Sequence, residues 1–217
     1  MTIRLLVLCL ALAATPLGAQ QSVARRLEGR VPPEVAALVV QLAADAAARG
    51  LPVEPLVQKA IEGSAKGVPA DRVAAAVRAV AAQLDAAAAA LRQGGLTSPD
   101  TDAIATGAFA LNAGLSDRHV KALALASHPP YGVATTLRVA GTLAAMGVPA
   151  AQAADLVTQV IELGGPVTDL LGLPAQVMAE VSHGRGGTPA QAAAGLARAA
   201  AARANAPGQN KPKHVKP

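Results

Sequence analysis

A short turn signal recurs along the whole chain and constrains its fold more than any other feature. Each copy is a glycine, one apolar residue, and then a proline, serine, threonine or alanine, except for a looser copy, Gly187-Thr188-Pro189, with threonine in the middle. Such a glycine can end a helix in the left-handed conformation, and the apolar residue can pack against that helix. The third residue can cap or start the next helix. The signal predicts helices joined by tight turns, and its copies begin at Gly50, Gly67, Gly95, Gly114, Gly132, Gly147, Gly172 and Gly187.

The segments between these turns carry the periodicity of amphipathic helices. Over 70–92, for example, Val73, Val77 and Leu84 fall on one narrow seam, whereas Arg78 and Asp85 fall on another face. No segment alternates with a period of two for long enough to predict a strand. We expect helices at 34–48, 55–65, 70–92, 100–112, 117–127, 134–145, 151–163, 175–182 and 189–205, with a short one at 166–171.

This pattern predicts an all-α fold of antiparallel helical hairpins, arranged as an irregular bundle or a short α-solenoid. Alternate turns are about 40 residues apart, which is the length of one helix pair in repeat proteins. Alanine makes up about a quarter of the chain, which has one Phe, one Tyr and no Trp. Alanine favours helices and allows them to approach closely, but it buries little area. We therefore expect a thin core between closely packed helices.

The N-terminus has the pattern of a secretory signal peptide. Arg4 precedes the ten-residue apolar run 5–14, and a small residue follows at Ala19. The run is too short to span a membrane as a helix. We expect residues 1–19 to be a signal peptide cleaved near Ala19 or Gln20, which implies export to the periplasm or beyond. Cleavage would remove Cys9, the one cysteine, and leave no further membrane-spanning segment.

Composition divides the rest of the chain into three parts. Gly94 and Gly95 mark a break, which predicts an N-terminal helical half at 20–93 and a C-terminal half at 94–205. The proline-rich segment 206–217 predicts a disordered basic tail. Its lysines, which could make a weak contact with an anionic surface, are Lys211, Lys213 and Lys216.

The net charge of +5 is concentrated at the two ends of the chain. Because the body between them is nearly neutral, the charge does not favour nucleic-acid binding.

No pattern of residues predicts catalysis or a metal site. The histidines lack the spacing of zinc ligands, so we expect no cofactor. Two Ser-His neighbours, Ser127-His128 and Ser182-His183, end predicted helices, and a hydrolase using one of them is a remote alternative. Asp100 and other acidic residues fall at predicted helix starts, where the helix dipole favours carboxylates.

The two aromatic residues are candidates for a partner contact. Aromatic side chains dominate the energetics of protein interfaces, and this chain has only Phe109 and Tyr131. We name Tyr131 as a candidate surface residue. The alternative is that Phe109 fills the core and Tyr131 packs over a turn.

The stretch from Gly50 to Gly67 matches a pattern written GLPxEPLVxKAxEG-x-x-KG. In this pattern, and in the alanine-rich helices that follow, the chain resembles exported helical proteins of high-GC bacteria, a family of unknown function. The resemblance implies export and a bacterial source but no site. If the segment carries an interaction surface, its candidates are Glu54, Lys59, Glu62 and Lys66. The alternative is a solvated helical face with pairs such as Glu62–Lys66.

These patterns together predict an exported, non-enzymatic helical protein of the cell envelope that binds or scaffolds a protein or another envelope component. A periplasmic carrier of an apolar ligand is the alternative. A cytoplasmic nucleic-acid-binding protein would require the signal peptide prediction to be wrong.

Overall fold

The computed structural model describes residues 17–184 and 187–205, in which the regular structure is entirely α-helical. The predicted all-α class is confirmed. The apolar run of the predicted signal peptide and the lysines of the predicted tail lie outside the described residues. The helices are α1 (Leu17–Leu27), α2 (Pro33–Ala48), α3 (Glu54–Ala65), α4 (Ala70–Gln93), α5 (Thr101–Asn112), α6 (Asp117–Ala126), α7 (Val133–Ala145), α8 (Ala150–Glu162), α9 (Val167–Ser182) and α10 (Pro189–Ala204).

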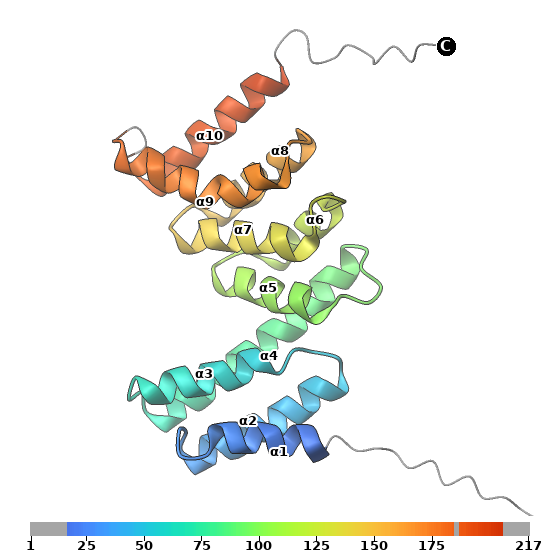
Figure 1. The fold of residues 1–217 in the computed structure, drawn as a ribbon, viewed down its shortest axis with the longest axis vertical. Coiled ribbons are helices and arrows are strands. Elements are labelled where there is room, and N and C mark those ends of the chain that lie inside the picture. Colours follow the sequence, from blue (N-terminus) through green and yellow to red (C-terminus); the bar gives the residue numbers. More distant parts are fainter. Residues whose placement is uncertain (1–16, 185–186, 206–217) are drawn as a thin grey trace, which may run out of the picture.

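The helices stack along the long axis of the molecule, with α1 and α2 at one end and α10 at the other (Figure 1). One layer contains α2, α4, α6, α8 and α10, and each of these helices packs on the next one in the layer. In the second layer α1 packs on α3, and α5 packs on α7, which packs on α9. Successive helices also pack on each other. The result is an elongated, solenoid-like stack of helical hairpins.

The turn at Gly50 shows how the recurring signal works. Gly50 has φ +70°, a conformation that residues with a side chain rarely adopt. The Leu51 N–H donates to the Ala46 carbonyl at 2.9 Å, and the Leu51 side chain is buried. This is the bond pattern of a Schellman helix end. The same pattern closes α3, α4, α5 and α7, so the predicted role of the glycines is confirmed at these turns.

The third residue of the turn caps or starts the next helix, as predicted, at Gly67, Gly114, Gly147 and Gly187, but not at Gly50 or Gly95, where Val53 and Asp100 are the N-caps. Pro69 and Pro149 occupy the N-cap positions of α4 and α8, one residue before the first helical turn in which we expected them. Ser116 and Thr188 form capping boxes with the third residue of α6 and of α10. The N-cap of α5 is Asp100, whose carboxylate accepts from the Ala103 N–H at 2.7 Å.

Three expectations about the turns and helices were wrong. Gly172 is not in a turn, because α9 runs continuously from 167 to 182 with Pro174 inside it. The turn before α9 is instead at Gly164, which has φ +66°. Gly132 has φ −72° and is the N-cap of α7 rather than the end of a helix. Helix α1 was not expected, and the predicted cleavage position falls within its first turn.

The core is continuous along the stack and is rich in alanine. One cluster of buried apolar residues extends from Val23 to Ala193 and crosses the break at Gly94. At that break α4 and α6 are in close contact, since a Cβ on Gly94 would lie 2.6 Å from the Ala124 Cβ. Small side chains therefore set the spacing of the helices here.

Candidate binding groove

The length of α4 opens a gap in one of the two layers. Helix α4 has 24 residues, whereas α3 and α5 have 12 each. Because α3 packs near the start of α4 and α5 near its end, both helices contact α4 but hardly contact each other. The space between them is a surface groove of about 300 Å³, which we call the α3–α5 groove.

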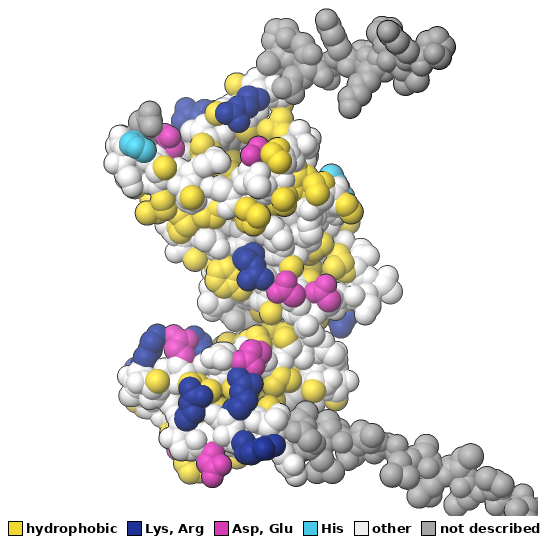
Figure 2. Space-filling model, viewed as in Figure 1, with side chains coloured by type: hydrophobic (Ala, Val, Ile, Leu, Met, Phe, Trp, Pro, Cys, Tyr) yellow, Lys and Arg dark blue, Asp and Glu magenta, His cyan; other side chains and the backbone are white. Residues whose placement is uncertain are grey.

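The α3–α5 groove has an apolar floor and polar edges. It lies at the waist of the molecule, where hydrophobic side chains are visible between the lower and upper helices (Figure 2). Val80 of α4 and Ala108 of α5 contribute to the floor. The complete lining is Pro55, Gln58, Lys59, Glu62, Val80, Gln83, Ala105, Ala108, Phe109 and Asn112.

Phe109 is the aromatic side chain of the groove and is not a core residue. It is 41% exposed, so the alternative that it fills the core was wrong, and it stays a candidate for a partner contact. A Cβ added to Gly141 of α7 would lie 2.8 Å from its ring, which shows that the ring rests on the bare backbone of α7. This support holds an exposed aromatic face in a fixed position.

Three side-chain amides line the groove and retain unused hydrogen-bonding groups. The Gln83 Nε2 donates to the Asn112 Oδ1 at 3.3 Å, and the Gln58 Nε2 donates to the Glu54 Oε1 at 2.6 Å. Within the described residues, no partner is found for the Gln58 and Gln83 carbonyl oxygens or for the Asn112 amide nitrogen. Two acceptors and one donor therefore remain for a ligand.

The α3 edge of the groove carries more positive than negative charge. Lys66 forms an ion pair with Glu62, as the sequence predicted, and the Lys59 Nζ lies 3.8 Å from the other carboxylate oxygen. The Lys66 hydrogen bond, with Coulomb attraction from both lysines, lowers the pKa of Glu62. Two ammonium groups thus share one carboxylate, which leaves about one positive charge at the edge.

Glu54, another of the sequence candidates, has a structural role and is not part of the groove lining. It accepts from both Arg26 nitrogens, at 2.7 and 2.6 Å, and so connects α3 to α1. These hydrogen bonds, with a smaller contribution from Gln58, lower the pKa of Glu54 to about 2. This pair was not predicted, because no helix was expected at the position of α1. Glu54 also fixes the amide of Gln58 at the groove edge.

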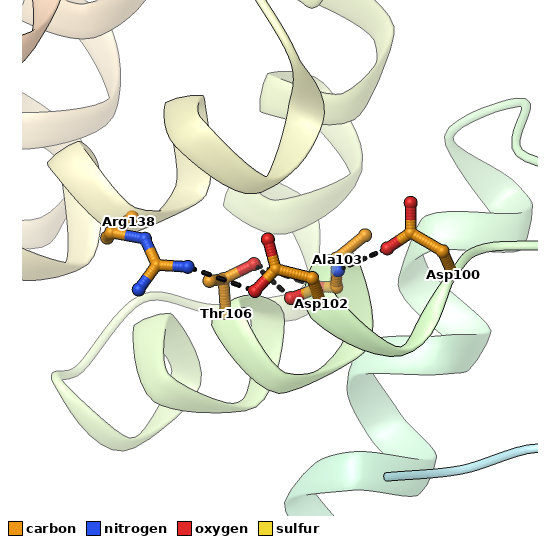
Figure 3. Close-up of polar contacts among 5 residues, drawn as sticks. All are labelled: Asp100, Asp102, Ala103, Thr106 and Arg138. Carbon is orange, nitrogen blue, oxygen red and sulfur yellow. Dashed lines mark hydrogen bonds and ion pairs between the residues drawn. The ribbon is translucent and has the colours of Figure 1, made fainter.

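The α5 wall is held in place at its N-terminal end (Figure 3). Asp102 in the first turn of α5 accepts from Arg138 of α7 at 3.0 Å. The Thr106 hydroxyl is buried and donates to the Asp102 and Ala103 carbonyls at 2.7 and 3.1 Å. The Arg138–Asp102 pair connects α5 to α7, whereas the Thr106 and Asp100 bonds stabilise the first turn of α5 itself. The groove therefore has one wall with a defined position.

Tyr131 cannot belong to an interaction surface. Its side chain is only 1% exposed, and its hydroxyl donates to the Gly165 carbonyl. The His128 ring packs edge-on against it, with centroids 5.7 Å apart. Tyr131 therefore connects the α6–α7 loop to the α8–α9 turn, which agrees with the alternative that it packs over a turn. Our naming of it as a surface candidate was wrong.

The two serines of the Ser-His neighbours are committed to helix ends. The Ser127 hydroxyl donates to the Leu123 carbonyl at 2.7 Å, and the Ser182 hydroxyl donates to the Met178 carbonyl at 2.8 Å. Neither hydroxyl is hydrogen-bonded to the adjacent histidine. No group of three or more metal-ligating side chains is found in the described part of the chain.

Helix α4 is, among the described helices, the one that is long and apolar enough to cross a membrane by composition alone. It packs against α2, α3, α5 and α6, which is the environment of a core helix.

Comparison with family models, curated proteins and solved structures finds no match for this chain. The resemblance to exported bacterial proteins therefore stays a prediction. The α3–α5 groove is the structural feature that bears on function.

Proposed function

We propose that this chain is an exported, non-enzymatic helical scaffold of the cell envelope, which binds an extended segment of a partner protein in the α3–α5 groove. The observation that supports it most is the exposed Phe109 ring, fixed against Gly141 beside three side-chain amides. An exposed aromatic residue in an otherwise aromatic-poor chain is a suitable anchor for a partner.

The amides favour a peptide as the partner. An extended peptide presents N–H and C=O groups that side-chain carboxamides can match as both donors and acceptors. The free acceptors of Gln58 and Gln83 and the free donor of Asn112 line the same groove as Phe109. An apolar side chain of the peptide would then pack against the Phe109 ring.

The excess positive charge favours a partner with an acidic residue. Lys59 shares its carboxylate with Lys66 and faces the groove. Its ammonium group can therefore pair with a carboxylate of the bound segment. The proposed ligand is a peptide with one large apolar residue and an acidic residue nearby.

A selection from a library of random linear peptides tests this proposal. Peptides that bind the immobilised chain would be synthesised, and their affinities measured by fluorescence anisotropy. We expect Phe109→Ala and Gln83→Ala each to weaken binding about tenfold or more, as for residues at the centre of an interface. Leu125→Ala is the matched control, because Leu125 is 62% exposed on α6 and outside the groove.

Peptides that bind equally well to the wild type and to Phe109→Ala would overturn the proposed site. Binding of a small apolar molecule that excludes every peptide from the groove would instead favour the carrier alternative.

Export is tested separately. The full-length chain would be expressed in a Gram-negative host, and its intact mass measured in the periplasmic and cytoplasmic fractions. We expect a periplasmic product cleaved near Ala19 or Gln20. An uncleaved cytoplasmic product would contradict export but would leave the groove proposal standing.

A further inference from the structure

The end of the stack formed by α1 and α2 presents an apolar face that no part of the described chain covers. Helix α1 packs on α2. On one side, α1 also packs on α3, and α2 packs on α3 and α4. Helices α1 and α2 form the lower end of the stack in Figure 1, and they border a groove of about 830 Å³. It is lined by residues of α1, of α2 and of the loop between them, and by no residue of any other described helix.

The floor of this groove is made of small apolar side chains. Ala36, Val40 and Ala44 follow one another at intervals of four on α2, with Ala37 beside them, and Ala24 faces them from α1. Elsewhere in the stack, the corresponding face of a helical hairpin packs against the neighbouring hairpin. The terminal pair of a solenoid lacks that neighbour, so its apolar face needs a polar surface or another cover. We call this groove and its edges the N-terminal end face.

The edges of the N-terminal end face carry unpaired charges of both signs. They are Arg25 and Glu28 on α1 and Asp45 on α2, and all three are exposed. Among the described residues, none of these three side chains forms an ion pair, whereas Arg26, Arg49 and Arg138 all do. A basic and two acidic groups around one apolar floor make a surface that is complementary in charge to itself.

We propose that the N-terminal end face is a homodimer interface, on which a second copy of this chain packs with the same face about a two-fold axis. A two-fold interface brings the same patch together from both copies, so a patch that contains both charges can satisfy itself. The small floor residues allow the two α2 helices to approach closely. The partner is another copy of this chain, and the face is distinct from the α3–α5 groove.

Sedimentation velocity over a range of protein concentrations tests the proposal. It would use the chain as recovered from expression, with its N-terminus defined by intact mass. We expect a reversible monomer–dimer equilibrium. Val40→Glu should raise the dimer dissociation constant at least about tenfold, because it places a carboxylate on the floor of the interface. Leu125→Glu adds the same charge at an exposed apolar site elsewhere and should leave the equilibrium unchanged.

Charge-reversal variants distinguish a specific interface from nonspecific hydrophobic association. Arg25→Glu makes the three edge charges acidic in both copies, and it should weaken the dimer through like-charge repulsion. The triple variant Arg25→Glu, Glu28→Arg, Asp45→Arg again carries both signs and should restore the dimer. If the dimer dissociation constant is the same for the wild type and for all of these variants, the proposal is overturned.

If something other than a second copy in a two-fold dimer occupies the N-terminal end face, the sedimentation experiment gives a different result. A monomer at every concentration would overturn the proposal. Where intact mass shows that this monomer is uncleaved and retains Cys9, protection of Cys9 from thiol reagents that Val40→Glu abolishes would identify residues 1–16 of the same chain as the cover. Growth into higher oligomers would indicate head-to-tail contact, which would also overturn a closed two-fold dimer.

Discussion

Arg26 donates to both carboxylate oxygens of Glu54, at 2.7 and 2.6 Å, and so connects α1 to a helix 28 residues further along the chain. This bidentate pair is the contact between charged side chains that holds the first helix to the third. Both side chains remain about half exposed, so water screens the pair and its contribution to stability is modest.

Glu54→Gln should lower the stability at neutral pH by at most about 1 kcal/mol. The pKa of Glu54 is lowered from 4.5 to about 2 in the folded chain. Its stabilising contribution is therefore complete above pH 4.5 and is lost as the pH falls to about 2. Urea denaturation across this range should show a smaller loss of stability with falling pH for Glu54→Gln than for the wild type. Glu162→Gln, at an exposed site that forms no ion pair with any described residue, should keep the wild-type profile.

Gly141→Ala should destabilise the chain by about 1–3 kcal/mol, as for overpacked sites. The added Cβ would lie 2.8 Å from the Phe109 ring and 3.1 Å from the Ala110 Cα, so both a side chain and backbone would have to move. The same change at Gly195 in α10 meets no atom within 4 Å and should stabilise by up to about 1 kcal/mol. Thermal unfolding of both variants checks the opposite signs, and equal shifts would contradict the close packing of Phe109.

Gly50→Ala should cost about 1–2 kcal/mol, because alanine would have to adopt φ +70°. No atom lies within 4 Å of the added Cβ, so the cost is conformational rather than steric. Gly132→Ala is the control, since Gly132 also has open space but has φ −72°. We expect a change of less than about 0.5 kcal/mol there, measured by chemical denaturation. A similar loss at both glycines would contradict the assigned helix end at Gly50.

Tyr131→Phe should destabilise the chain by about 1 kcal/mol, because it removes the hydroxyl that donates to the Gly165 carbonyl. The ring itself would keep its buried position. Ser182→Ala, which removes an exposed hydroxyl bonded within its own helix, should change the stability by less than about 0.5 kcal/mol. The urea midpoints of both variants provide the measurement. An unchanged midpoint for Tyr131→Phe would mean that this bond adds nothing to the connection between the two loops.

Most of the helices could be predicted from the sequence because their ends are determined locally. A left-handed glycine followed by an apolar residue closes a helix with bonds inside six residues, as at Gly50 and Gly147. Where tertiary packing outweighs local preference, the prediction failed. Proline inside a helix costs about 3 kcal/mol, yet α9 continues through Pro174 because Leu170, Leu173 and Val177 are buried on both sides of it.

Helix α1 was missed although its sequence contained a signal. Val23 and Leu27 lie four residues apart and are both buried, which is the minimum pattern of an amphipathic helix. The predicted cleavage near Ala19 or Gln20 lies just before these residues, so no helix was expected there. Missing α1 also concealed the Arg26–Glu54 pair and the N-terminal end face.

The candidate site was predicted only in part. Lys59 and Glu62 do line the groove, as a half-buried and an exposed residue of a predicted helix. The opposite wall depends on Phe109, whose exposure follows from its contact with Gly141, 32 residues away, and from the length of α4. No local pattern reports such a relationship, so the sequence could not show which of the two aromatic residues is exposed and which is buried.

The stacking of each helix on its neighbours and next-nearest neighbours also bears on how the chain folds. Because those contacts join segments close in sequence, the fold has low contact order, which is associated with rapid folding. Folding can begin at any helix pair and spread in both directions. The 24 residues of α4 are the link through which it must pass between the two ends. A chain organised in this way can gain or lose a pair at a turn during evolution while the other pairs keep their contacts.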